Sequence, residues 1–210
     1  LDDGVAVANH GESGETYAAS IGRGRLHKVE ELMRPGDYLM LQFGHNDMKQ
    51  RGDGKGPFEN YTEEMRQHVE AARAKRATPI LITSMHRQRF DEEGRVVNTL
   101  GDYPEAVRRL AAELDVALID LHEMSAGLYD AFGPEGSNVL FKYGDGTHHN
   151  NFGAYQLAKC VAEGIRRSGL SLARHLVTDF DGFDPAHPDD PAAFEVPASG
   201  TATGRKPDGD

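Results

Sequence analysis

The chain has 210 residues, which is enough for one domain with a sizeable core but too few for two large domains. Its 34 acidic and 23 basic side chains give a net charge of −11, which argues against nucleic acid as a partner because phosphates would be repelled. No apolar run approaches the ~20 residues that a membrane span needs. The single cysteine, Cys160, excludes an intrachain disulfide. The composition therefore indicates a globular domain that binds neither nucleic acid nor a membrane.

Short apolar runs recur along the chain and predict five strands. They lie at residues 5–8, 38–43, 80–83, 116–119 and 139–141. The first four are continuous and flanked by Gly, Pro or Asp, which is typical of parallel strands that are buried on both faces.

Helical patterns separate several of these runs. Asn60 with Glu63 and Asp102 with Glu105 have the spacing of N-terminal capping boxes, and apolar residues follow each pair at helical spacing. A third helix is predicted to begin near Asn151, a good N-cap. Alternating strands and helices predict a mostly parallel sheet with helices on both faces.

The composition changes near residue 179. Residues 179–210 contain five prolines among Gly, Asp and Ser, and few residues that could form a core. We therefore expect residues 1–178 to form one domain and residues 179–210 to be a disordered tail. The first residues, 1–4, have no Met start and no signal-type apolar core, and we expect the domain to be truncated at its N-terminus.

The first candidate site combines Asp145 and His148, in a loop of small residues before the last predicted helix. An Asp three residues ahead of a His can orient and charge-balance an imidazole that acts as a general base. The alternative is an Asp that caps a turn beside an exposed His. Because His149 adjoins His148, a metal site is a further alternative, but no second cluster of ligands has a recognisable spacing.

Two glycine-containing loops supply candidate hydrogen-bond donors. Asn46 follows the predicted strand at residues 38–43, where its amide could donate to a developing oxyanion. Gly14, in the loop after residues 5–8, could expose its backbone N–H to the same oxyanion. The alternative for both loops is an ordinary structural turn with local Asx hydrogen bonds.

The order of these three blocks resembles that of the SGNH (GDSL-type) hydrolases. The local sequences around Gly14, Asn46 and His148 are most similar to those of rhamnogalacturonan acetylesterases. The resemblance implies a three-layer α/β/α, flavodoxin-like fold and a serine esterase that needs no metal or organic cofactor. It assigns the oxyanion donors to Gly14 and Asn46, the triad acid to Asp145 and the triad base to His148.

The sequence departs from this family in one block, because it contains no Gly-Asp-Ser and hence no recognisable nucleophile. Ser13 lies beside the oxyanion glycine, and Ser84 ends a strand whose end is not catalytic in the family, so we assign neither. In the strand order 2-1-3-4-5 of this fold, the first strand lies between those predicted at residues 5–8 and 38–43. We therefore expect this central strand to be missing.

The resemblance also implies a substrate and a partner, an acetylated plant polysaccharide. Removal of O-acetyl groups from pectic rhamnogalacturonan is the expected activity, and Lys49, Arg87 and Arg89 could hold galacturonate carboxylates near the reacting ester. The alternatives are an esterase for another acetylated sugar, such as xylan, and an inactive carbohydrate-binding relative. The family favours a secreted or periplasmic location.

Overall fold

A computed structural model describes residues 1–195 and contains a parallel sheet of three strands in the order β1-β2-β3. The strands are β1 (Tyr38–Leu41), β2 (Thr78–Ile82) and β3 (Ala117–Ile119). In the register, Met40 is opposite Ile80, and Ile80 is opposite Ala117. Three of the five predicted strands are therefore confirmed.

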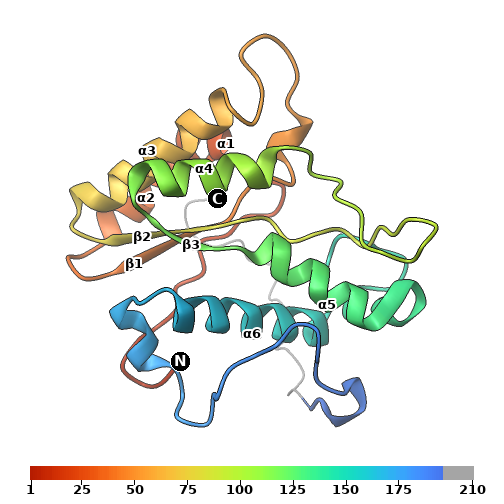
Figure 1. Cartoon of the computed structure of the whole chain (residues 1–210). Coiled ribbons are helices and arrows are strands. Elements are labelled where there is room, and N and C mark those ends of the chain that lie inside the picture. The colour runs from red at the N-terminus through yellow and green to blue at the C-terminus, as the bar shows by residue number, and fades with distance from the viewer. Residues whose placement is uncertain (196–210) are drawn as a thin grey trace, which may run out of the picture.

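Helices cover both faces of the sheet and complete a three-layer α/β/α fold (Figure 1). One layer consists of α1 (Tyr17–Gly22), α2 (Arg25–Leu32), α3 (Asn60–Ala74) and α4 (Tyr103–Leu114). The opposite layer consists of α5 (Leu121–Gly136) and α6 (Asn151–Arg167). Short 3-10 helices are η1 (Asp47–Lys49), η2 (Ser137–Leu140), η3 (Ser171–His175) and η4 (Pro191–Ala193). This architecture confirms the predicted fold class.

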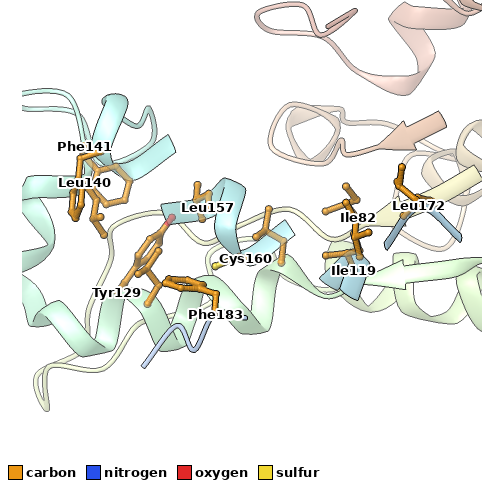
Figure 2. Close-up of a cluster of buried hydrophobic side chains, with 14 residues drawn as sticks. Ile82, Ile119, Tyr129, Leu140, Phe141, Leu157, Cys160, Leu172 and Phe183 are labelled. Carbon is orange, nitrogen blue, oxygen red and sulfur yellow. The ribbon is translucent and has the colours of Figure 1, made fainter. Parts of the chain in front are cut away.

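The two faces of the sheet belong to two different parts of the core. Ile80 and Ile82 face α5 and α6, whereas Leu81 between them packs against α3 and α4, as the alternation of side chains along a strand requires. Figure 2 shows the first cluster, in which Ile82 and Ile119 from the sheet continue into Cys160 and other side chains of the helical layer. Both faces of β2 are covered, which explains its continuous apolar sequence, whereas β1 is less buried and its Met40 is 38% exposed.

Two predicted strands are wrong. Residues 5–8 pair with no strand in the described part of the chain, and Val7 is 79% exposed, so neither ladder hydrogen bonds nor burial favour a strand there. Residues 139–140 lie in η2, and Phe141 forms only an isolated bridge with His149. The Asn150 side chain donates hydrogen bonds to the carbonyl groups of Val139 and Phe141, which would otherwise be available to a ladder.

A cleft of about 1760 Å³ runs along β1. Its walls include β1, the segment 4–15 and the loop that carries His148. Within the described residues, β1 pairs with β2 alone, so the backbone groups on its other edge face this cleft. The carboxyl end of β1 continues directly into the Asn46 loop. The cleft therefore connects the free edge of the sheet with the loops that hold the candidate site.

Residues 179–195, within the expected tail, pack onto α6. Phe183 is 7% exposed and belongs to the core cluster in Figure 2. Asp189 accepts hydrogen bonds from Lys159 Nζ at 2.8 Å, and the Phe194 ring lies 5.2 Å from that of Phe152. The remainder of the predicted tail, residues 196–210, lies outside the described residues.

Truncation of Phe183 tests whether this packing stabilises the domain. We expect Phe183→Ala to lower the free energy of unfolding by about 3–4 kcal/mol, because it removes a buried ring and leaves a cavity. Phe58→Ala is a matched control, since Phe58 is 46% exposed and its loss should cost less than about 1 kcal/mol. Urea unfolding curves measure both. Equal stability of the two variants would contradict the structural role of residues 179–195.

Candidate active site

The loop that carries Asp145 and His148 is a closed turn. Its base is the antiparallel bridge between Phe141 and His149, and inside it the Lys142 N–H donates to the His148 carbonyl at 2.9 Å. Immediately after the loop, Asn150 accepts a hydrogen bond from the Gly153 N–H and caps α6. The loop is thus held at both ends by backbone hydrogen bonds and by the start of a helix.

Asp145 and His148 form the expected hydrogen-bonded pair. His148 Nδ1 lies 2.5 Å from Asp145 Oδ2, and Asp145 Oδ1 accepts the backbone N–H groups of Thr147 and His148 at 2.8 and 3.0 Å. The His148 and Thr147 N–H groups, followed by the imidazole, lower the pKa of Asp145 to about 2. An ionised Asp145 keeps the proton on Nδ1. Nε2 of His148, whose side chain is 65% exposed, is then free to accept one.

The Asn46 loop has a shape that only glycine at position 44 permits. Gly44 has φ +136°, and a Cβ there would lie 2.6 Å from Ser84 Oγ. Asn46 follows as the N-cap of η1, and its Oδ1 accepts a hydrogen bond from Lys49 Nζ at 2.7 Å. Its Nδ2 donates to no group among the described residues. The amide therefore keeps a free donor at the end of β1.

Asp47 connects the two donor loops, a role that the sequence analysis missed. Its Oδ1 accepts the Tyr17 N–H at 2.9 Å, and its Oδ2 accepts the Gly44 N–H at 3.0 Å. The side chain is almost fully buried, and this desolvation raises the pKa of Asp47 to about 6. Its position directly after the candidate donor Asn46 indicates that Asp47 lies near the site, but its contact with the distant Tyr17 depends on the fold.

Gly14 lies in the loop that leads into α1. It has φ +77°, in the left-handed region that favours glycine, and its N–H donates to no group in the described part of the chain. Arg25 anchors the loop from α2, with Nη2 3.0 Å from Glu12 Oε2 and Nε 3.3 Å from Glu15 Oε2. The Gly14 N–H therefore lies in a loop that Arg25 holds on both sides, through Glu12 and Glu15.

The cleft beside β1 brings most of the predicted site residues together. Gly14, Asn46 and His148 line it, as do Lys49 and Arg87, whereas Asp145 supports His148 from behind. The Arg87 guanidinium donates to the His45 carbonyl and to Thr99 Oγ1, both at 3.2 Å. It therefore links the Asn46 loop, which contains His45, to the segment that contains Thr99.

Arg89 has a different setting from Arg87. Its side chain is exposed, and it does not belong to the lining of the cleft. Only its backbone makes hydrogen bonds, with Arg87 and Val97. Of the three basic residues predicted to bind substrate, two therefore lie in the cleft and one lies outside it.

No serine within residues 1–195 forms a hydrogen bond with His148. Ser84 Oγ is buried and donates to the Phe43 carbonyl at 2.5 Å, and Ser20 Oγ lies 3.0 Å from His68 Nε2. Ser13 is exposed in the Gly14 loop and has no side-chain partner. Neither Ser13 nor Ser84 is thus paired with the candidate base.

His45 and His149 line the cleft and are partly buried, whereas His86 and His122 are buried and do not line it. His149 Nε2 lies 2.7 Å from Tyr129 Oη, while the His86 ring stacks on that of His122 at 3.7 Å. In residues 1–195, no three His, Cys, Asp or Glu side chains are grouped to hold a metal ion. Burial lowers the pKa values of His45, His86 and His149 to about 4. These rings are therefore neutral packing groups at neutral pH.

These imidazoles predict loss of stability in mild acid. In the unfolded chain they bind protons near pH 6.5 but in the folded protein only near pH 4, so protonation between these values favours unfolding. Asp47 acts in the opposite direction, because its raised pKa lets the folded state hold a proton that the unfolded state has lost. Among these four groups, three against one leave about two net protons, or about 2.7 kcal/mol per pH unit near pH 5, and the lowered pKa values of His68 and His122 act in the same direction as those of the three imidazoles.

Urea unfolding at about pH 7 and about pH 5 measures this slope. The free energy of unfolding should fall with the pH, and His86→Gln should reduce the slope because it removes one of the three groups. A free energy of unfolding that is constant or higher at the lower pH would contradict the prediction.

Comparisons with known proteins identify the family of this chain. Residues 2–156 match the GDSL-like lipase/acylhydrolase family. The chain is 43% identical over 191 residues to rhamnogalacturonan acetylesterase RhgT of Bacillus subtilis, an alignment that covers 85% of this chain and 82% of the relative. The chain therefore belongs to the GDSL-like lipase/acylhydrolase family.

Solved structures show the same fold. The crystal structure of the Bacillus subtilis protein YxiM has a TM-score of 0.71 and 31% identity, and the match covers 79% of this chain and 47% of that chain. This chain thus corresponds to about half of the YxiM structure. An acetyl xylan esterase, AlAXEase, has a TM-score of 0.58 at 19% identity over 72% of this chain and 76% of its own, a likeness of fold alone. No helix in residues 1–195 is both long and apolar enough to cross a membrane.

Proposed function

We propose that this protein is a serine esterase that removes O-acetyl groups from a pectic polysaccharide. The observation that carries the proposal is one cleft lined by a base and two free donors: His148, ordered by Asp145, with the Gly14 N–H and the Asn46 amide. A base and preorganised donors are what acyl transfer through a tetrahedral intermediate requires. The 43% identity to RhgT, a rhamnogalacturonan acetylesterase, supports the choice of substrate.

The proposed reaction has two stages. His148 Nε2 takes the proton of a serine hydroxyl as the serine oxygen attacks the acetyl carbonyl, and Gly14 and Asn46 stabilise the resulting oxyanion. The intermediate collapses, the bond to the sugar oxygen breaks, and His148 returns the proton to that oxygen. Water then attacks the acetyl-serine with His148 as base, the bond to the serine oxygen breaks, His148 returns the proton to the serine, and acetate leaves. Asp145 stabilises the imidazolium in both stages.

The free edge of β1 supports a proposal for the position of the serine. We propose that it lies in the cleft beside the free edge of β1, within reach of both His148 Nε2 and the Asn46 amide. An extended segment placed there would also pair with the exposed backbone groups of β1. Ser13 and Ser84 are not assigned this role, because neither is paired with His148 and Ser84 is already bonded to the Phe43 carbonyl.

Positive charge near the cleft is proposed to favour an acidic polymer. Lys49 and Arg87 in the cleft and Arg89 outside it offset the net charge of −11 where a galacturonate chain would approach. Exposed ion pairs contribute only about 0–1 kcal/mol each and are screened by salt. Together they should favour acetylated rhamnogalacturonan over neutral acetylated xylan by about tenfold.

The test compares acetate release by the full-length gene product from these two polymers at low and high salt. We expect the preference for rhamnogalacturonan to fall with added salt and in Arg87→Ala/Arg89→Ala. Equal specificity constants under all conditions would contradict the proposed substrate. Absence of acetate release from either polymer would contradict the proposed activity itself.

A further inference from the structure

Among the described residues, the Lys49 side chain donates one hydrogen bond, and its acceptor is Asn46. Its Nζ lies 2.7 Å from Asn46 Oδ1. An ammonium group has donors and no acceptor, so the amide atom that faces it must be the oxygen. The other end of the amide, Nδ2, is then the end that remains free. Lys49 thereby determines which group of Asn46 is available in the cleft.

The backbone places these two side chains on the same side of one turn. Asn46 precedes η1 and Lys49 is its last residue, and the Lys49 N–H donates to the Asn46 carbonyl at 3.0 Å. Three residues complete a turn of a 3-10 helix, so the side chains at positions 46 and 49 eclipse each other. Arg87 engages the His45 carbonyl and Thr99 instead. Among the described residues, Lys49 is thus the cation that contacts the side-chain oxygen of Asn46, Oδ1.

A cation on the amide oxygen has two effects on the amide nitrogen. It holds the orientation in which N–H groups, and not the oxygen, are presented to a developing negative charge. It also draws electron density from the amide, which strengthens the N–H groups as donors. A reversed amide would instead place an acceptor against an oxyanion, which is repulsive.

We propose that Lys49 is a positioning residue that orients and polarises Asn46 as an oxyanion donor. This inference rests on the proposed esterase function. It gives Lys49 a role in the reaction of every acetyl ester, whereas a lysine that binds galacturonate would matter only for acidic substrates. A small neutral ester therefore distinguishes the two roles.

The experiment measures hydrolysis of p-nitrophenyl acetate by the full-length gene product and its variants. We expect Lys49→Ala to lower kcat about tenfold with little change in KM, because a transition-state donor is weakened. Lys49→Arg should restore most of the activity, since a guanidinium can donate to the same oxygen. Lys55→Ala is the matched control, because Lys55 is exposed in the segment that follows η1 and does not line the cleft.

A double-mutant cycle with Asn46→Ala separates positioning from folding. In the Asn46→Ala background, Lys49→Ala should have no further effect on kcat, since there is no amide left to orient. Additive losses, or a Lys49→Ala variant that is impaired only on acidic polysaccharide, would overturn the inference while leaving the proposed function intact. Full activity of Asn46→Ala would overturn the assignment of Asn46 itself, and the role of Lys49 with it.

Discussion

Replacement of His148 by alanine in the full-length gene product should reduce kcat/KM for acetyl esters by at least ~10⁴-fold, or about 5.5 kcal/mol. The loss is large because base and nucleophile act as a unit, and His148 is the imidazole that Asp145 orients in the cleft. Stability should hardly change, since the His148 side chain is largely exposed. Initial rates with p-nitrophenyl acetate and an unfolding curve measure the two quantities.

The chain contains a matched control for this variant. Asp184 and His187 have the same spacing and the same contact, with His187 Nδ1 2.7 Å from Asp184 Oδ2, but His187 does not line the cleft. His187→Ala should therefore leave kcat/KM unchanged. Comparable losses in His148→Ala and His187→Ala, or no loss in either, would contradict the assignment of the base.

Replacement of Asn46 by alanine should lower kcat by about 10²–10³-fold, with a much smaller effect on KM. The amide is expected to donate mainly to the oxyanion, so its loss removes an interaction that is made in the transition state. Asn46→Asp should be impaired at least as much, because it keeps the size of the side chain but replaces the donor with a negatively charged acceptor. Steady-state kinetics at saturating substrate give the split between kcat and KM.

The Asn46→Ala variant also tests whether the side chain itself takes part in the reaction. Alanine at position 46 should leave the backbone of the loop in place, because that backbone is held by Asp47 and Gly44. A kcat near that of the unmodified enzyme in Asn46→Ala, with the fold retained, would remove Asn46 from the reaction.

Buried periodic elements were the part of the fold that the sequence predicted best. The strands β1, β2 and β3 overlap the predicted apolar runs, because strands of a parallel sheet that helices cover on both faces are largely apolar. The last helix was also predicted from its apolar stripe, although its N-cap is Asn150 and not the predicted Asn151. Residues 5–8 have the same composition as a strand but no partner to pair with. Composition alone does not show whether a partner is present.

The candidate site was predictable where its contacts are local. Asp145 and His148 are three residues apart, and the loop brings them together without help from distant elements. The link from Asp47 to Tyr17 spans 30 residues and could not be read from spacing. Likewise, Arg87 could be placed at the end of β2 but not assigned its contact with the His45 carbonyl. Long-range polar contacts depend on how helices and strands pack.

The packing of residues 179–195 also depends on contacts that the sequence does not predict. Its prolines and acidic residues favour an irregular backbone, which the structure contains, but an irregular segment can still bury a ring. Phe183 is buried because Glu163 accepts its backbone N–H and Lys159 lies 4.6 Å over its ring centroid. These partners are on α6, and the sequence pattern around Phe183 gives no sign of them.

The most direct test of the central claim, that His148 activates a serine in the cleft beside β1, is covalent labelling with an aryl fluorophosphonate. Such reagents react with a serine whose hydroxyl is activated by a neighbouring base. Peptide mass spectrometry of the full-length gene product should find one adduct, on a serine, and His148→Ala should abolish the adduct while His187→Ala retains it. Absence of an adduct, or an adduct formed equally well by His148→Ala, would contradict the account.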